Sequence, residues 1–208
     1  MAEYICLNIA IIPPEKVAIA AIELSQELSR LGKVSFILDG KNFHPHVTCY
    51  SPEFPTKNLD KIFESIEELA GNFKSFSCDF LELQTHDGYI DIEAQLNREF
   101  KQLHETIIEK LNPLREGHLR EKYTVEENLQ SLTEEQRQNI QKYGYPDVME
   151  LYRPHMTLIR LEDADEAVVL LKGIKWDIDE LKVDAVAAFT MSSHGTCKKL
   201  LNEFSLLR

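Results

Sequence analysis

The five-residue pattern x-Pro-His-x-Thr occurs twice in this sequence, at residues 44–48 and again at residues 153–157. Each copy supplies one histidine, His46 in the first and His155 in the second. Histidine titrates near neutral pH, so one imidazole can accept a proton while another donates one. Repetition of the whole pattern predicts a single site, built from two half-sites that converge on one ligand.

Each copy lies in an apolar, strand-like stretch, and side chains alternate along a strand. His46 and Thr48 should therefore share one face, as should His155 and Thr157, while the apolar residues between them face the core. Across one cleft, the hydroxyls could bind phosphate oxygens and the imidazoles could flank the phosphorus. We therefore predict general acid–base catalysis, which contributes about 10²–10⁴-fold to rates, without a metal or a covalent intermediate.

Three flanking residues are candidate substrate contacts. Arg153 and His44 occupy equivalent places in the two copies and could contact phosphate. Tyr50 shares the strand face of Thr48 and could stack on a base. Core packing is the competing interpretation for Tyr50, and a surface position is the competing interpretation for His44. The other histidines receive no role: His86, His104, His118 and His194.

The two H-x-T motifs, each preceded by proline, resemble those of the 2H phosphoesterase superfamily. Residues 153–160 (RPHMTLIR) are particularly similar to the second motif of the bacterial 2′,5′ RNA ligases, which are also RNA 2′,3′-cyclic phosphodiesterases. The resemblance implies a two-lobed, pseudo-symmetric fold with the active site between the lobes. It assigns catalysis to His46 and His155, and phosphate binding to Thr48 and Thr157.

Composition limits the partners of this 208-residue chain. Its net charge of −12, with no run rich in Lys or Arg, argues against a general nucleic-acid-coating protein. A small nucleotide or an RNA end held in a local cleft remains compatible. No apolar run approaches the roughly 18 residues of a membrane helix. We expect a monomer that needs no cofactor.

The chain start and the cysteines bear on location. Residues 1–6 carry no basic segment ahead of an apolar one, so we expect no secretory signal. The four cysteines are scattered, without a C-x-x-C pair, which is typical of reduced thiols. We therefore predict a cytoplasmic protein.

Periodicity predicts an α+β fold in which antiparallel sheet packs against helices. The resemblance implies that this fold has two pseudo-symmetric lobes, with the active-site cleft between them. Strands are expected over residues 3–12, 34–38, 45–50, 73–83, 89–94, 153–161, 183–191 and 198–206, the last two joined by a turn at residues 192–195. Helices are expected over residues 17–31, 56–70, 97–111 and 163–174.

We predict one domain over residues 1–208, interrupted by a polar excursion at about residues 113–150. A capping box that begins at Thr133 predicts a short exposed helix ending near Gly144. A functional lid and a tolerated surface insertion are equally consistent with this segment. If it is a lid, Tyr143 and Tyr145 are candidate contacts.

The leading hypothesis is a metal-independent phosphodiesterase, similar to 2′,5′ RNA ligases, acting on 2′,3′-cyclic or 2′,5′ phosphodiesters of RNA ends or small nucleotides. The alternative is a non-catalytic module that binds a phosphorylated ligand or nucleotide with the same side chains. A zinc site of His44, His46 and His155 ranks below both, because Thr two residues after a histidine is a poor zinc ligand.

Overall fold

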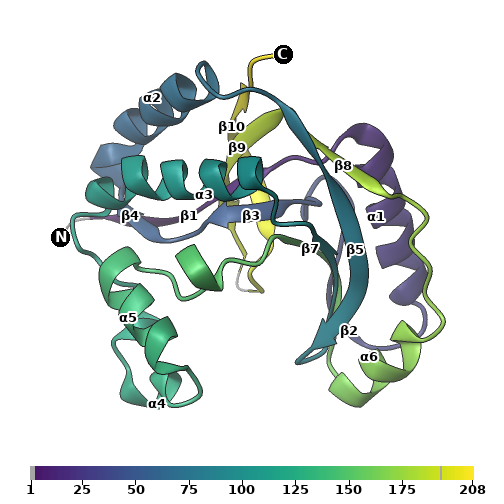
Figure 1. Ribbon diagram of the computed structural model, residues 1–208. Coiled ribbons are helices and arrows are strands. Elements are labelled where there is room, and N and C mark those ends of the chain that lie inside the picture. Colours follow the sequence, from purple (N-terminus) through teal and green to yellow (C-terminus); the bar gives the residue numbers. More distant parts are fainter. Residues whose placement is uncertain (1–2, 193) are drawn as a thin grey trace.

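The computed structural model describes residues 3–192 and 194–208, and their sheet and helices are drawn in Figure 1. Met1 and Ala2 at the chain start, and Ser193 in the predicted last turn, lie outside the described residues. The strands are β1 (Tyr4–Ile11), β2 (Val34–Ile37), β3 (Val47–Tyr50), β4 (Glu53–Pro55), β5 (Phe76–His86), β6 (Tyr89–Ala94), β7 (His155–Leu161), β8 (Glu180–Val183), β9 (Ala185–Met191) and β10 (Cys197–Ser205). The α-helices are α1 (Glu15–Leu28), α2 (Leu59–Ala70), α3 (Arg98–Leu111), α4 (Glu126–Leu129), α5 (Glu134–Tyr143) and α6 (Ala164–Leu171).

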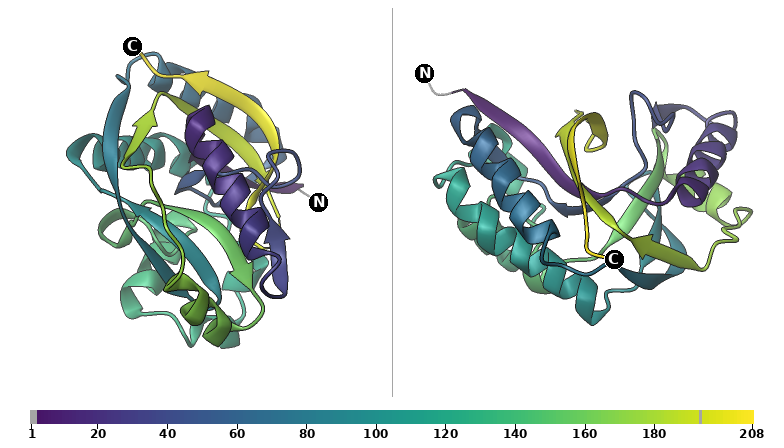
Figure 2. Two further views of the ribbon diagram at one scale, coloured as in Figure 1. Left: turned by 90° about the vertical axis from the view of Figure 1, so that its right-hand side faces the viewer. Right: turned by 90° about the horizontal axis from the view of Figure 1, so that it is seen from above.

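The strands form one curled antiparallel sheet, in the order β10-β9-β1-β3-β7-β6-β5-β8, with β4 on β1 and β2 on β7. The β3–β7 pair joins two lobes. Helices α2 and α3 lie side by side against the β3 lobe, whereas α1 and α6 cover the β7 lobe (Figures 1 and 2). The predicted α+β architecture is thus confirmed.

Burial explains why these segments adopt their structures. Residues 7–11 of β1 are all fully buried, because neighbouring strands flank β1 and both faces of the sheet are covered there. Helix α3 begins at Asn97, whose side chain accepts a hydrogen bond from the Phe100 amide at 2.8 Å. Its apolar stripe is buried, which anchors the helix beside β3.

The polar excursion is a packed segment that carries α4 and α5 (Figure 1). The predicted capping box at Thr133 is present, and α5 ends at Gly144. Gly144 has a φ of 72°, and a Cβ there would meet the Arg115 side chain at 2.7 Å, so both conformation and space require glycine. Arg115 is buried and donates hydrogen bonds to the carbonyl oxygens of His118 and Lys142, which tie the two ends of the excursion together.

Two strands were missed from sequence. Strand β4 is three residues long and ends in Pro55, too short to show alternation. Strand β8 was missed because the predicted strand over residues 183–191 begins at its last residue; Asp184 separates β8 from β9, and β8 pairs with β5. In residues 3–192 and 194–208, no helix combines the length and apolar character needed to span a membrane.

Candidate functional site

The two motif strands are neighbours at the centre of the sheet. Val47 of β3 lies directly opposite Met156 of β7, and both side chains are fully buried on one face. Alternation therefore turns the residues on either side of each toward the opposite face, where they meet in the middle of the molecule. We call these four side chains the quartet: His46, Thr48, His155 and Thr157.

The antiparallel register fixes how the quartet is arranged. Because Val47 pairs with Met156, His46 lies opposite Thr157, and Thr48 lies opposite His155. Side chains directly opposite in such a pair have Cβ atoms about 4.5–5.5 Å apart. Each histidine thus has a threonine of the other half-site across from it.

Backbone hydrogen bonds hold both imidazoles in one orientation. The Nδ1 atom of His46 lies 2.8 Å from the carbonyl oxygen of His44, and Nδ1 of His155 lies 2.8 Å from that of Arg153. A carbonyl oxygen can only accept, so Nδ1 carries the hydrogen in each case. The Nε2 atom is then the site that can accept a proton from a neutral imidazole, or release one from an imidazolium.

The first half-site favours a neutral histidine. His46 is only 5% exposed, and burial lowers its pKa to about 4, against the weaker opposing effect of its bond to the His44 carbonyl. Behind it, Asn8 of β1 donates from Nδ2 to Oγ1 of Thr48 at 2.9 Å. This bond occupies an acceptor position of the Thr48 hydroxyl, which leaves its proton available for a ligand.

The second half-site contains a buried carboxylate, Asp91, where the first half-site contains the side-chain amide of Asn8. Asp91 of β6 pairs with Thr157 and is 1% exposed. Its Oδ2 lies 3.2 Å from Nδ1 of His86 and 4.0 Å from a guanidinium nitrogen of Arg153. Burial raises the pKa of Asp91, but His86, the positive charge of His155 and the Thr157 hydroxyl together outweigh it, and the net direction is downward.

The two half-sites therefore differ in charge although their motifs match. The half-site of His155 contains the Asp91 carboxylate, whose pKa is lowered, whereas the half-site of His46 contains a neutral amide and His46 itself is deeply buried. The sequence alone left the two histidines equivalent. The neighbouring strands β1 and β6 distinguish them.

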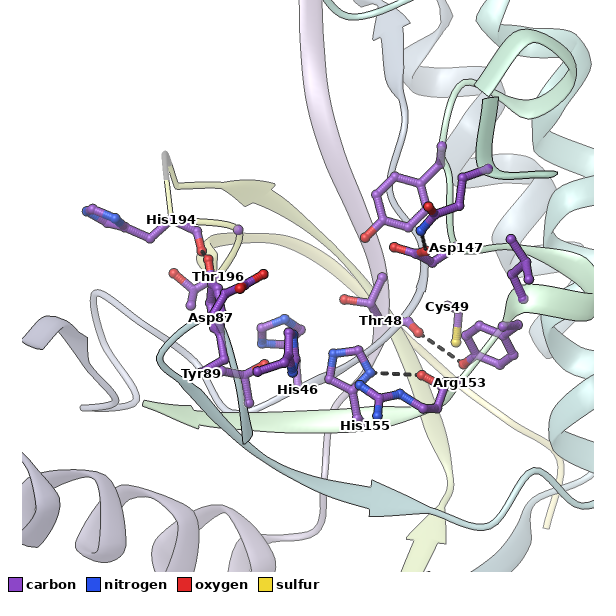
Figure 3. Close-up of a pocket in the computed structure, with 17 residues that line it drawn as sticks. His46, Thr48, Cys49, Asp87, Tyr89, Asp147, Arg153, His155, His194 and Thr196 are labelled. Atoms are coloured by element: carbon purple, nitrogen blue, oxygen red, sulfur yellow. Dashed lines mark hydrogen bonds between the residues drawn. The ribbon is translucent and has the colours of Figure 1, made fainter. Parts of the chain in front are cut away.

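The quartet opens into a cavity of about 580 Å³. Figure 3 shows His46, Thr48 and His155 near its centre, with Arg153 and Asp147 on one side and Asp87, Tyr89, His194 and Thr196 on the other. The wall on the excursion side comes from α5 and the segment after it: Gln136, Tyr145, Asp147 and Leu151. The excursion is therefore part of the cavity rather than a remote insertion.

The flanking candidates fall in different places. Arg153 lines the cavity and also lies 3.8 Å from the Glu93 carboxylate. Tyr50 as a substrate contact is a wrong prediction, because its side chain is fully buried and its hydroxyl donates to the Tyr143 carbonyl at 2.6 Å. The excursion covers this part of the strand face. His44 does not line the cavity; its ring packs 5.3 Å from that of Phe189.

Two histidines without a sequence role line the cavity, namely His86 at the end of β5 and His194 in the β9–β10 connection. Of the two excursion tyrosines, Tyr145 lines the cavity and Tyr143 belongs to the core. Both missed histidines lie at hairpin turns, where loops carry functional residues on a rigid sheet. That position was their only sequence signal.

The zinc alternative has no geometric support. Across residues 3–192 and 194–208, no three His, Cys, Asp or Glu side chains gather closely enough to hold a metal ion. The Nδ1 atoms of His46 and His155 are also committed to backbone carbonyls, which leaves one nitrogen on each ring.

Comparison with known proteins assigns the fold. It is similar to TT0787 of Thermus thermophilus (18% identity, 97% of each chain, TM-score 0.57). It is also similar to LigT of E. coli (12% identity, 99% of each chain, TM-score 0.57) and to a protein described as a phosphoesterase (13% identity, 99% and 100%, TM-score 0.53). The resemblance to the 2H phosphoesterases seen in the motifs is thus confirmed for the fold.

Residues 54–196 match the model of a protein family of unknown function, DUF1045. Since the match covers well over half of the chain, the protein belongs to this family. The matched range contains the second motif and the excursion, and begins after the first motif. No curated protein matches the chain in sequence.

Proposed function

We propose that this protein is a metal-independent phosphodiesterase that hydrolyses a cyclic 2′,3′ phosphodiester, or a 2′,5′ one, at an RNA end or in a small nucleotide. The observation that carries the proposal is the quartet, in which two imidazoles with available Nε2 atoms and two hydroxyls share one face of the β3–β7 pair. A site that only bound an anion would need no proton acceptor, since Arg side chains and backbone amides suffice.

The charge difference between half-sites gives each histidine a role. His46 is neutral at pH 7 and acts as the general base, taking a proton at Nε2 from the attacking water. His155, whose half-site contains the Asp91 carboxylate, acts as the general acid and donates a proton from Nε2 to the leaving ribose oxygen. Water oxygen bonds to phosphorus as the ester bond breaks, which yields a phosphate monoester and a free hydroxyl.

The remaining groups bind the phosphate. Thr48, whose hydroxyl is oriented by Asn8, donates to a non-bridging oxygen, and Thr157 occupies the equivalent place in the other half-site. Arg153 supplies positive charge at the cavity wall. In reverse, with a hydroxyl as nucleophile, the same proton transfers would join two ends, as a ligase requires.

The ligands of LigT support a nucleotide substrate. LigT of E. coli has been solved in complexes with phosphate, 3′-AMP, ATP and NADP+. These are phosphate and adenosine phosphates, the class of ligand that the quartet and the cavity of about 580 Å³ would take.

Turnover of nucleoside 2′,3′-cyclic monophosphates in the presence of a chelator tests the proposal. We expect hydrolysis that resists the chelator, and the ratio of 2′- to 3′-monophosphate identifies the bond that is cleaved. Adenosine and cytidine substrates should be compared, since the cavity wall includes aromatic side chains that could stack on a base. Absence of product from cyclic and 2′,5′-linked substrates, despite measurable binding, would leave the binding module as the better account.

A further inference from the structure

A second cavity, of about 450 Å³, adjoins the one at the quartet. The two cavities share three lining residues, Tyr145, Asp147 and Gly195. The second cavity is also lined by Arg120 and Lys122, which come from the excursion. A ligand bound at the quartet could therefore extend past Tyr145 toward two cationic side chains.

Arg120 is anchored so that part of its guanidinium stays available. Its Nη2 donates to the carbonyl oxygen of Ser51 and, at 3.2 Å, to the Ser51 hydroxyl. Its Cζ lies 5.8 Å from the centre of the Tyr145 ring. Its Nε is buried and has no hydrogen-bond partner among the described residues. A buried donor without a partner is costly, and a ligand oxygen would remove that cost.

Lys122 lies close enough to Arg120 for the two positive charges to interact. Although Lys122 is exposed as a residue, desolvation around its ammonium, followed by the charge of Arg120, lowers its pKa. In the part of the chain that the structure describes, no carboxylate lies within 4.0 Å of either cation. Asp147 in the shared wall accepts a hydrogen bond from Gln136 at 2.9 Å. Two adjacent, unpaired cations are notable in a protein with a net charge of −12.

The geometry points to a second phosphate-binding site at Arg120 and Lys122, which would hold a phosphate monoester on the same small molecule whose phosphodiester reacts at the quartet. The inference rests on the proposed function for its pose. A phosphate monoester is close to a dianion at pH 7, so it matches two cations better than a diester, which carries one charge. The planar guanidinium suits two phosphate oxygens, and the lysine ammonium adds a third contact.

The inference also gives the excursion a role. Without residues 113–150, the chain would lack both cations and the wall formed by Tyr145 and Asp147. The preferred substrate would then be a phosphorylated cyclic nucleotide or a similar bisphosphate, rather than a long RNA, which the overall negative charge disfavours.

Equilibrium binding tests the second site without requiring turnover. Affinities of adenosine 3′,5′-bisphosphate and adenosine 3′-monophosphate are measured by calorimetry at fixed salt, for the wild type and for Lys122→Gln. We expect the wild type to bind the bisphosphate about tenfold to a hundredfold more tightly, as charge-assisted hydrogen bonds typically allow. Lys122→Gln should reduce this preference by about tenfold. Lys122 is exposed, so the variant should fold.

Lys142→Gln is the matched control. Lys142 is an exposed lysine of the same excursion that lines neither of these two cavities, and its ammonium lies 4.9 Å from the Tyr143 ring centre. This variant should keep the full preference for the bisphosphate. Equal affinities of wild type for the two ligands, or equal loss of preference in both variants, would overturn the second site. Absence of hydrolysis with an intact preference would instead count against the proposed function alone.

Discussion

Acid should destabilise this protein through two buried histidines before its carboxylates titrate. His46 is 5% exposed and His104 is fully buried, and burial lowers the pKa of each from 6.5 to about 4. His104 also accepts a hydrogen bond at Nε2 from the Met149 amide at 2.9 Å, while its Nδ1 lies 2.7 Å from the Cys49 carbonyl. Protonation of His104 would break the bond to Met149.

The sign and size follow from linkage. Between the folded pKa of about 4 and the unfolded value of 6.5, the unfolded chain binds more protons, so stability falls as the pH falls. One pKa unit corresponds to about 1.4 kcal/mol, so each histidine contributes at most about 3 kcal/mol over the whole window. Between pH 7 and pH 5, each should account for a loss of about 2 kcal/mol.

Urea unfolding at a series of pH values from 7.5 to 4.5 measures this loss. The wild type should lose about 4 kcal/mol between pH 7 and pH 5 from the two histidines together. His46→Gln and His104→Gln should each be less stable at pH 7 but should each lose about 2 kcal/mol less on acidification. Wild-type stability that stays constant over this range, or variants with the same pH dependence as wild type, would refute the reasoning.

Three further substitutions test individual positions. Asp91→Asn removes the carboxylate of the second half-site and should lower kcat/KM by about tenfold. An unchanged kcat/KM would contradict the role of Asp91. Thr48→Val removes a phosphate donor and leaves the Asn8 amide unpaired, so kcat/KM should fall about tenfold to a hundredfold. Thr48→Ser should restore most of this activity, and full activity of Thr48→Val would exclude the contact with phosphate. Tyr50→Phe removes the hydrogen bond to the Tyr143 carbonyl, so it should lower the free energy of unfolding by about 1 kcal/mol and leave kcat/KM unchanged. A kinetic defect without a stability defect would contradict the assignment of Tyr50 to the core.

Local patterns predicted the motif strands well. Alternation around His46 and His155 reported the faces correctly, because Val47 and Met156 are fully buried where the pattern requires it. The capping box at Thr133 was readable for the same reason, since all of its groups lie within four residues.

Contacts between segments that are far apart in the chain could not be predicted from the sequence. Tyr50 shares the alternation of Thr48, yet the excursion folds back over it, and the contact with Tyr143 joins residues far apart in the chain. The partners Asn8 and Asp91 were also hidden, because strand order rather than local sequence places β1 and β6 beside the motif strands. The difference between the half-sites is thus a property of the sheet.

The most direct test of the central claim separates the two histidines by leaving group. A phosphodiester with a 4-nitrophenyl leaving group needs no proton to release its product, whereas a ribose oxygen does. On nucleoside 2′,3′-cyclic phosphates, His46→Ala and His155→Ala should each reduce kcat by about 10²–10⁴-fold. On the 4-nitrophenyl ester, His155→Ala should recover most of the wild-type rate, while His46→Ala should remain impaired. Recovery in the His46 variant instead would reverse the roles, and full activity of either variant on the cyclic substrate would contradict two-histidine catalysis.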